Sequence, residues 1–147
     1  MTIRWATRED IPAAAALEAE LFPDGASAAF LERLAAGEGG GVLVAEEDGA
    51  VWGCAWYQLV LDEGYVGNVA VAEPYRRLGV GTALVRAMLD RARERRAAFL
   101  TLEVRESNRA ARRLYERCGF VTAGVRKNYY ERPREDAILM TFFFNQL

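Results

Sequence analysis

The stretch Arg76-Arg77-Leu78-Gly79-Val80-Gly81-Thr82 decides the fold that this sequence favours. It follows the apolar run Val69-Ala70-Val71 and opens a helical pattern that is rich in arginine. A strand, a short glycine-bearing loop and a helix together gather unpaired backbone N–H groups around a point where an anion can bind. Gly79 and Gly81 leave room for a ligand near the backbone, because neither carries a Cβ. A pyrophosphate group is the ligand that this arrangement fits best.

The bulk properties of the chain indicate an ordinary globular protein. Its 147 residues are 52% hydrophobic and 27% charged. This composition suits a single domain over residues 1–147 that buries a core without disulfide or metal cross-links. A net charge of −2 gives no sign of nucleic-acid binding. No apolar run reaches the roughly 18 residues of a membrane span, and no signal-peptide core follows Met1. We therefore expect a cytoplasmic protein without membrane or nucleic-acid partners.

The chain has two cysteines and no histidine, which restricts the chemistry it can perform. Cys54 and Cys118 lack the spacing of metal ligands, so no metal is expected, and a histidine-based triad is excluded. Both cysteines are interpreted as small core residues, because free cysteine is among the most buried residue types. Acid–base chemistry must then come from Glu, Asp, Tyr, Lys or the cysteines.

The segments before the glycine loop predict two helices and three strands. Thr7 or Asp10 can cap a first helix, which ends near Phe22. One face of that helix is formed by residues at helical spacing, namely Ile11, Ala14, Leu17, Glu18 and Leu21. A second helix is predicted over residues 28–35. Residues 42–45 and 51–60 are typical of a hairpin, because Asp48-Gly49 between them is a turn signal, and a third strand follows over residues 65–71.

After the glycine loop the pattern alternates between helix and strand. Apolar spacing predicts a helix over residues 82–95, a buried strand over 99–104 and a second helix over 109–117. Strands over residues 120–125 and 137–144 close the chain. This α/β order predicts a mixed sheet with helices on both sides. Ligands collect at the carboxyl ends of diverging strands in such sheets, so the ends of the 65–71 and 99–104 strands are expected to face one cleft.

Several motifs resemble the GNAT acetyltransferases. The glycine loop is similar to the acetyl-CoA pyrophosphate loop of that family, and Leu102-Glu103-Val104-Arg105-Glu106-Ser107-Asn108 with Leu114-Tyr115 and Gly119-Phe120 is similar to its second signature. The tail from Gly124 to Tyr130, with Glu135-Asp136-Ala137, resembles the RimI-like N-alpha-acetyltransferases more narrowly. These enzymes modify the amino-terminal alanine of a ribosomal protein. The resemblance covers roughly residues 60 to 143, and it implies a central, mostly antiparallel sheet flanked by helices.

The resemblance implies acetyl-CoA as co-substrate and assigns residues to it. Backbone groups of the strand and the glycine loop would bind it, together with the side chain of Asn108, although Asn108 could equally be a plain helix cap. The residues assigned in this way are Val69, Ala70, Val71, Arg76, Arg77, Leu78, Gly79, Val80, Gly81, Thr82 and Asn108.

Two residues are candidates for catalysis. Glu103, at a strand end that we expect to be buried, would be the general base, acting through a water. The alternative is a carboxylate paired with Arg105 or another arginine. Tyr115 would be the general acid that protonates the departing thiolate, and the alternative is a core tyrosine, because Ala111 shares its helix face.

The acceptor site is expected between the last two strands, where Tyr129, Tyr130 and Glu135 would contact a cationic N-terminus. Cross-strand packing of the tyrosine pair is the alternative. Where RimI-like proteins often carry a Pro-Trp-Ser step, this chain has Pro23-Asp24-Gly25-Ala26, so the identity of the acceptor stays open.

The function hypotheses differ in the acceptor. An α-amino group has a reference pKa near ~8 and a lysine near ~10.4, so a weak base suffices for an N-terminus. The leading hypothesis is therefore acetylation of a protein N-terminus, with a ribosomal protein bearing N-terminal alanine as partner. A small-molecule amine or a lysine side chain is the second hypothesis, and a non-catalytic acyl-CoA-binding module is the third. A monomer or weak dimer is expected.

Overall fold

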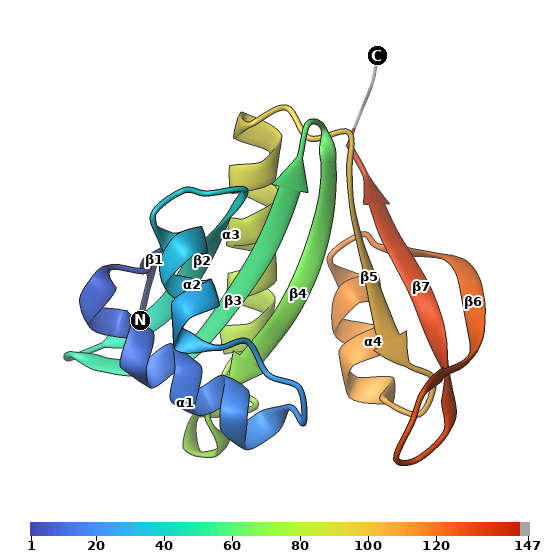
Figure 1. The fold of residues 1–147 in the computed structure, drawn as a ribbon, viewed down its shortest axis with the longest axis horizontal. Helices are drawn as coiled ribbons and strands as arrows, with labels where there is room; N and C mark the ends of the chain where they lie inside the picture. The colour runs from blue at the N-terminus through green and yellow to red at the C-terminus, as the bar shows by residue number, and fades with distance from the viewer. Residues whose placement is uncertain (145–147) are drawn as a thin grey trace.

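The computed structural model describes residues 1–144, which form one sheet with helices on both faces (Figure 1). The sheet is seven-stranded, in the order β1-β2-β3-β4-β5-β7-β6. All neighbouring strands are antiparallel except the parallel pair β4 and β5. The strands are β1 (Thr2–Trp5), β2 (Gly40–Glu47), β3 (Ala50–Val60), β4 (Glu63–Val71), β5 (Phe99–Arg105), β6 (Val121–Tyr130) and β7 (Glu135–Phe143).

Four α-helices cover the sheet, two on each face (Figure 1). They are α1 (Ile11–Leu21), α2 (Ala28–Ala35), α3 (Val80–Glu94) and α4 (Arg109–Arg117). The predicted bounds of α2 and α4 are confirmed, and the side chains of Ser27 and Asn108 cap these two helices by accepting from Phe30 N and Ala111 N. The mixed fold expected from the sequence is confirmed.

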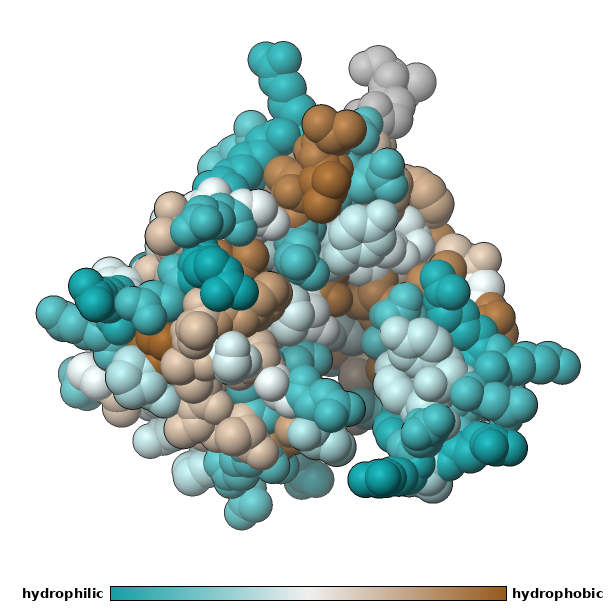
Figure 2. All heavy atoms as spheres, in the orientation of Figure 1, coloured by the Kyte–Doolittle hydropathy of each residue, from teal (hydrophilic) through white to brown (hydrophobic). Residues whose placement is uncertain are grey.

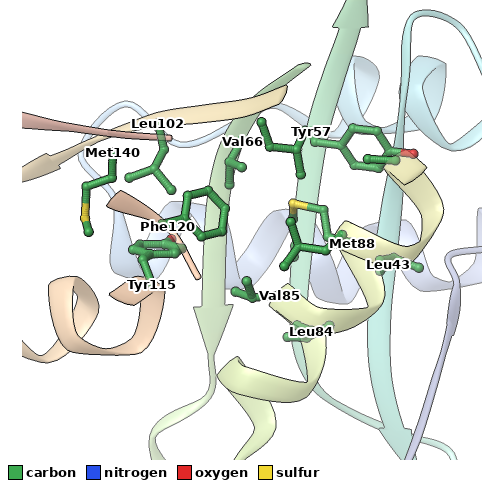
Figure 3. Packing of buried hydrophobic residues seen from close by; sticks show 14 of the residues in the cluster. Leu43, Tyr57, Val66, Leu84, Val85, Met88, Leu102, Tyr115, Phe120 and Met140 are labelled. Atoms are coloured by element: carbon green, nitrogen blue, oxygen red, sulfur yellow. The ribbon is translucent and has the colours of Figure 1, made fainter. Parts of the chain in front are cut away.

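Two hydrophobic cores lie on opposite faces of the sheet. The larger one packs α3 and α4 against the strands, with Leu84 and Met88 of α3 fully buried and Tyr115 of α4 beside Phe120 (Figure 3). The smaller one packs α1 and α2 against β2 and β3 and includes Cys54, which is 1% exposed. Cys118 packs half-buried against the larger core. The core interpretation of both cysteines therefore holds.

Two expectations about the strands were wrong. The predicted order begins with a helix, but the structure adds β1 before it, paired in antiparallel register with β2 from Thr2↔Glu46 to Trp5↔Leu43. The last hairpin is also longer than expected, because β6 continues to Tyr130 and pairs there with Glu135. Tyr129 and Tyr130 therefore belong to β6 itself. In both cases the pairing partner, which lies elsewhere in the sequence, extends the strand.

Candidate active site

The two central strands separate and open a cavity in the middle of the sheet. β4 and β5 pair from Glu63↔Phe99 to Tyr65↔Thr101 and then diverge. A cavity of about 970 Å³ lies at the opening, and the surface is hollowed there between the α1 side and the β6–β7 side (Figure 2). Its lining residues are Leu21, Phe22, Pro23, Asp24, Gly67, Asn68, Val69, Glu103, Val104, Arg105, Asn108, Ala111, Tyr115, Tyr129, Tyr130, Glu131 and Arg132. The cleft expected between these strand ends is present.

A β-bulge in β4 lies at the edge of this opening. Val66 pairs with Tyr57 and Val69 with Ala55, so that Gly67 and Asn68 stand opposite a single residue, Trp56. A Cβ on Gly67 would lie 2.3 Å from the indole ring of Trp56, so only glycine fits there. Bulges bend a strand and re-aim its side chains, and they are common beside active sites. This one turns β4 where it leaves β5.

Glu103 lines the cavity from β5, as the sequence suggested, but it is not buried. Its side chain is 32% exposed and both of its oxygens have partners. Arg126 Nε lies 3.4 Å from Oε1, and the hydroxyl of Tyr129 donates a hydrogen bond to Oε2 over 3.2 Å. The arginine partner is thus on β6. Arg105 pairs instead with Glu135, at 3.1 Å. The carboxylate is therefore fixed in orientation yet open to the cavity.

Tyr115 lines the same cavity from α4 and is almost fully buried. It is 8% exposed and stacks edge-on against Phe120, with 5.4 Å between the ring centroids. Burial raises the pKa of its phenol far above the ordinary value of 10.0. Tyr115 therefore belongs to the core and to the cavity at once, and its phenol keeps its proton at neutral pH.

The glycine loop leads into α3 and presents free backbone donors. Gly79 is the N-cap with a φ of +81°, and no atom lies within 4 Å of where its Cβ would be. The first helical hydrogen bond of α3 runs from Ala83 N to Gly79 O, so the preceding N–H groups have no helical partner. A Cβ on Gly81 would lie 2.9 Å from Leu114, so this glycine also permits close packing of α3 on α4. Arg76 and Arg77 are exposed beside the loop.

These features fit the acetyl-CoA implied by the resemblance. Phosphate groups bind at the free N–H groups of a helix N-terminus. Past Tyr65, the edge of β4 that faces β5 has no strand partner, so its backbone groups can form hydrogen bonds with the amide groups of the extended arm of coenzyme A. Of the predicted cofactor residues, Val69 and Asn108 line the cavity. The others, Ala70, Val71 and the loop from Arg76 to Thr82, lie along β4 and at the start of α3, outside that lining.

The predicted acceptor residues have different surroundings. Tyr129 and Tyr130 line the cavity with their rings edge to face at 5.1 Å, and the Arg105 guanidinium lies 4.3 Å from the Tyr130 ring centre. Burial raises the pKa of Tyr130 to about 12. Glu135 lies outside the lining: it pairs with Arg105 and accepts from Ser107 N at 2.6 Å, which lowers the pKa of its carboxyl. The structure thus gives Glu135 partners within the protein.

Sequence reasoning missed several polar residues of this site. Arg126 anchors Glu103, and Asn68, Asp24 and Glu131 line the cavity. Glu18 lies next to the lining residue Asn68 and has no exposed surface, although it carries a carboxylate. A charged residue on the apolar face of a predicted helix was the signal that could have found it. For the others the sequence offered no signal, because the bulge and the strand register bring them to the cavity.

Within residues 1–144, no group of three or more His, Cys, Asp or Glu side chains is placed to hold a metal ion. In the same part of the chain, no helix is both long and apolar enough to cross a membrane.

Comparisons with known proteins identify the family of this chain. The model of the acetyltransferase (GNAT) family matches residues 3–120. A ribosomal protein bS18-alanine N-acetyltransferase of Escherichia coli is 46% identical over 96 residues, which cover 64% of this chain and 65% of that protein. The chain thus spans just under two thirds of that relative's length in the alignment.

Solved structures extend the similarity to nearly the whole chain. The crystal structure of the ribosomal-protein-S18-alanine N-acetyltransferase from Escherichia coli has a TM-score of 0.86 and 37% identity, covering 99% of this chain and 95% of that one. A ribosomal-protein-alanine N-acetyltransferase from Brucella melitensis has a TM-score of 0.87 and 26% identity, covering 98% and 100%. The resemblance seen in the sequence is confirmed: the chain belongs to the acetyltransferase (GNAT) family and is an acyltransferase that uses acetyl-CoA.

Proposed function

We propose that this protein acetylates the N-terminal α-amino group of a protein, and that its acceptor is a ribosomal protein with N-terminal alanine. The observation that supports this most is that Glu103 and Tyr115 line one cavity, from β5 and α4, where β4 and β5 separate. The first is a carboxylate that can accept a proton and the second a phenol that keeps one. Acetyl transfer to an amine removes a proton from the amine and ends with a proton on the thiol, so both groups can assist it.

Glu103 is proposed as the general base. An α-amino group with a pKa near ~8 is neutral in roughly one molecule in ten at pH 7, so little basicity is required. Because Arg126 and Tyr129 hold its two oxygens, the carboxylate keeps one orientation at the cavity. A carboxylate exposed in this way can receive the amine's proton directly or through a water.

Tyr115 is proposed as the general acid. When bound, acetyl-CoA supplies the thioester carbonyl that the amine attacks. The phenol of Tyr115 carries a proton on its Oη at neutral pH, as any tyrosine does, and its place in the cavity lining makes this proton available to a thiolate that forms there. The residues proposed to hold the co-substrate are Val69, Ala70, Val71, Arg76, Arg77, Leu78, Gly79, Val80, Gly81, Thr82 and Asn108.

The proposed acceptor rests on the relatives and on the cavity wall. The Escherichia coli and Brucella melitensis proteins bear names of ribosomal-protein-alanine N-acetyltransferases. The lining holds three carboxylates and two arginines, so its negative charge is in slight excess, which favours a cationic N-terminus; these residues are Asp24, Glu103, Glu131, Arg105 and Arg132. Tyr129 and Tyr130 are the proposed contacts for the first residues of the acceptor. Glu135 would act indirectly, because it pairs with Arg105, whose guanidinium lies over the Tyr130 ring.

A ribosomal acceptor would place the protein in the cytoplasm. We further propose that residues 1–147 form one domain, which agrees with a single sheet running from Thr2 to Phe143 in the described residues.

An acceptor comparison tests the proposed function. The protein is incubated with acetyl-CoA and one of three amines: a peptide that begins with alanine, the same peptide with a blocked N-terminus and an internal lysine, or spermidine. Thiol release is followed, and mass spectrometry locates the acetyl group. Acetylation of the free N-terminus alone is expected. Turnover of spermidine alone would reject the proposal, and coenzyme A binding without any turnover would favour a non-catalytic module.

A further inference from the structure

Glu18 of α1 is a fully buried carboxylate that the proposed reaction does not use. It has 0% exposed surface, and no described residue from 1 to 144 forms an ion pair with it. Its Oε1 accepts three hydrogen bonds: from Asn68 Nδ2 at 2.8 Å, Ala26 N at 2.9 Å and Trp56 Nε1 at 3.0 Å. Its Oε2 is buried without a partner. The donors come from β4, β3 and the loop after α1, so Glu18 joins three segments.

Glu18 dictates the orientation of the Asn68 amide. The carboxylate oxygen that faces Asn68 only accepts hydrogen bonds and repels a carbonyl oxygen, so the NH₂ end of the Asn68 amide faces it. The carbonyl oxygen of Asn68 is then left on the other side of the amide plane. No group among residues 1–144 donates to this oxygen, and it is not among the buried unpaired atoms. Because Asn68 lines the cavity, its carbonyl oxygen is available there.

We propose that Asn68 contacts the acceptor amine through Oδ1 and that Glu18 is the positioning residue that orients it. The inference rests on the proposed function, since it assigns a partner to the amine in the same cavity. An amine or ammonium group donates hydrogen bonds, and the free oxygen of Asn68 accepts them. Asn68 also lies in the bulge of β4, so its side chain is re-aimed at the place where β4 leaves β5.

Glu18 has a second effect on the same cavity. Its hydrogen bond from Ala26 N fixes the end of the loop whose earlier residues, Phe22, Pro23 and Asp24, line the cavity. The close approach of this loop requires a glycine, because a Cβ on Gly25 would lie 2.4 Å from the carbonyl oxygen of Glu18. One carboxylate therefore sets both the acceptor wall and the proposed amine contact.

The contact with the amine is tested by Asn68→Ala with two ligands. One is the alanine-initiated peptide as substrate, and the other is its des-amino analogue, which lacks only the amine, as competitive inhibitor. The variant is expected to raise the peptide KM about tenfold or more, the order of a hydrogen bond to a charged donor, while the inhibition constant of the analogue stays unchanged. The KM of acetyl-CoA is expected to stay constant. Gln58→Ala, which removes an exposed amide on β3, is the matched control.

The positioning role of Glu18 is tested by a pair of variants. Glu18→Gln keeps an accepting oxygen and is expected to retain the peptide KM within about twofold, although it loses stability from a buried NH₂ group. Glu18→Leu has no acceptor and is expected to raise the KM as Asn68→Ala does. In the double variant Glu18→Leu/Asn68→Ala, no further rise is expected, because Glu18 acts through Asn68. Thermal melts restrict the kinetics to temperatures at which each variant is folded.

The outcomes separate this inference from the proposed function. If Asn68→Ala raises the peptide KM and the inhibition constant of the des-amino analogue equally, or changes neither of them, the amine contact is wrong while the N-terminal activity stands. If Glu18→Leu leaves the peptide KM unchanged, the positioning role is rejected. If both Glu18 variants fail to fold and Asn68→Ala does not change the peptide KM, the positioning role is rejected as well. If the wild type acetylates only spermidine, the proposed function fails, and an unchanged spermidine KM in Asn68→Ala then rejects the contact as well.

Discussion

The hydroxyl of Tyr129 donates a hydrogen bond to Oε2 of Glu103 across 3.2 Å, which ties the end of β6 to the open end of β5. Arg126, also on β6, lies 3.4 Å from the other oxygen of the same carboxylate. The strand between them, β7, pairs with both β5 and β6. The orientation of Glu103 at the cavity thus depends on the hairpin that closes the chain.

The charge of Glu103 raises the pKa of Tyr129, and burial adds to this effect. A negative carboxylate disfavours a nearby phenolate, so Glu103→Gln is expected to lower the Tyr129 pKa toward its ordinary value of 10.0. NMR titration with ring-labelled tyrosine measures this shift, and Tyr129→Phe identifies the resonance. An unchanged pKa in Glu103→Gln would show that the two side chains do not meet in solution.

Glu103→Gln is also expected to lower kcat by about 100-fold or more, the usual range for loss of a positioned base. The affinity for coenzyme A should change little, because the backbone provides most of its proposed contacts. Glu106→Gln, an exposed neighbour outside the cavity lining, is the matched control and should retain activity. Equal kcat in both variants would remove Glu103 from catalysis.

Tyr115→Phe is expected to lower kcat by about 100-fold while coenzyme A affinity stays constant. The ring remains packed against Phe120, so the fold should tolerate the loss of one hydroxyl. Steady-state kinetics and calorimetry with coenzyme A give the two quantities. A kcat equal to that of the wild type would leave Tyr115 as a core residue only.

The pair of Arg4 and Asp10 predicts acid sensitivity. Arg4 donates to both Asp10 oxygens, at 2.7 and 3.0 Å, and these bonds lower the pKa of Asp10 below its ordinary value of 3.8. The stabilisation is therefore complete above about pH 3.8 and is lost as the pH falls through the lower folded-state pKa. Asp10→Asn is expected to reduce the free energy of unfolding by about 2 kcal/mol at pH 7. The free energy of unfolding of this variant is also expected to fall less than that of the wild type as the pH is lowered.

Denaturant melts between pH 2 and 7 measure that profile. Asp90→Asn is a suitable control, because Asp90 forms only an exposed pair with Arg93 at 3.6 Å, and such pairs contribute little. An acid profile of Asp10→Asn that parallels the wild type would contradict the assignment.

Local sequence signals predicted much of the fold. The bounds of α4 followed from Asn108 as a cap, and the glycine loop located the start of α3 within two residues, at Val80. Such signals depend on neighbouring residues in the chain. They also placed Glu103 at the cleft, because it lies at a predicted strand end, whereas Tyr115 was assigned through the resemblance of Leu114-Tyr115 to the family motif.

Features set by contacts between distant segments could not be predicted in the same way. β1 is a strand because β2 pairs with it, and the opening in the sheet depends on the bulge of Gly67 and Asn68 opposite Trp56. The exposure of Glu103 follows from the same separation of strands. Glu18 looked like one more position on a helix face, and its role depends on donors that lie as far away as Asn68.

The central claim is that an N-terminal amine meets acetyl-CoA between β4 and β5. A crystal structure with coenzyme A joined covalently to the α-nitrogen of an alanine-initiated peptide tests it most directly. We expect the pyrophosphate at the amides from Gly79 to Thr82, the linked nitrogen in the cavity beside Glu103, and the peptide between Asp24 and Tyr129. A peptide portion bound outside this cavity, or phosphates away from the start of α3, would contradict the account.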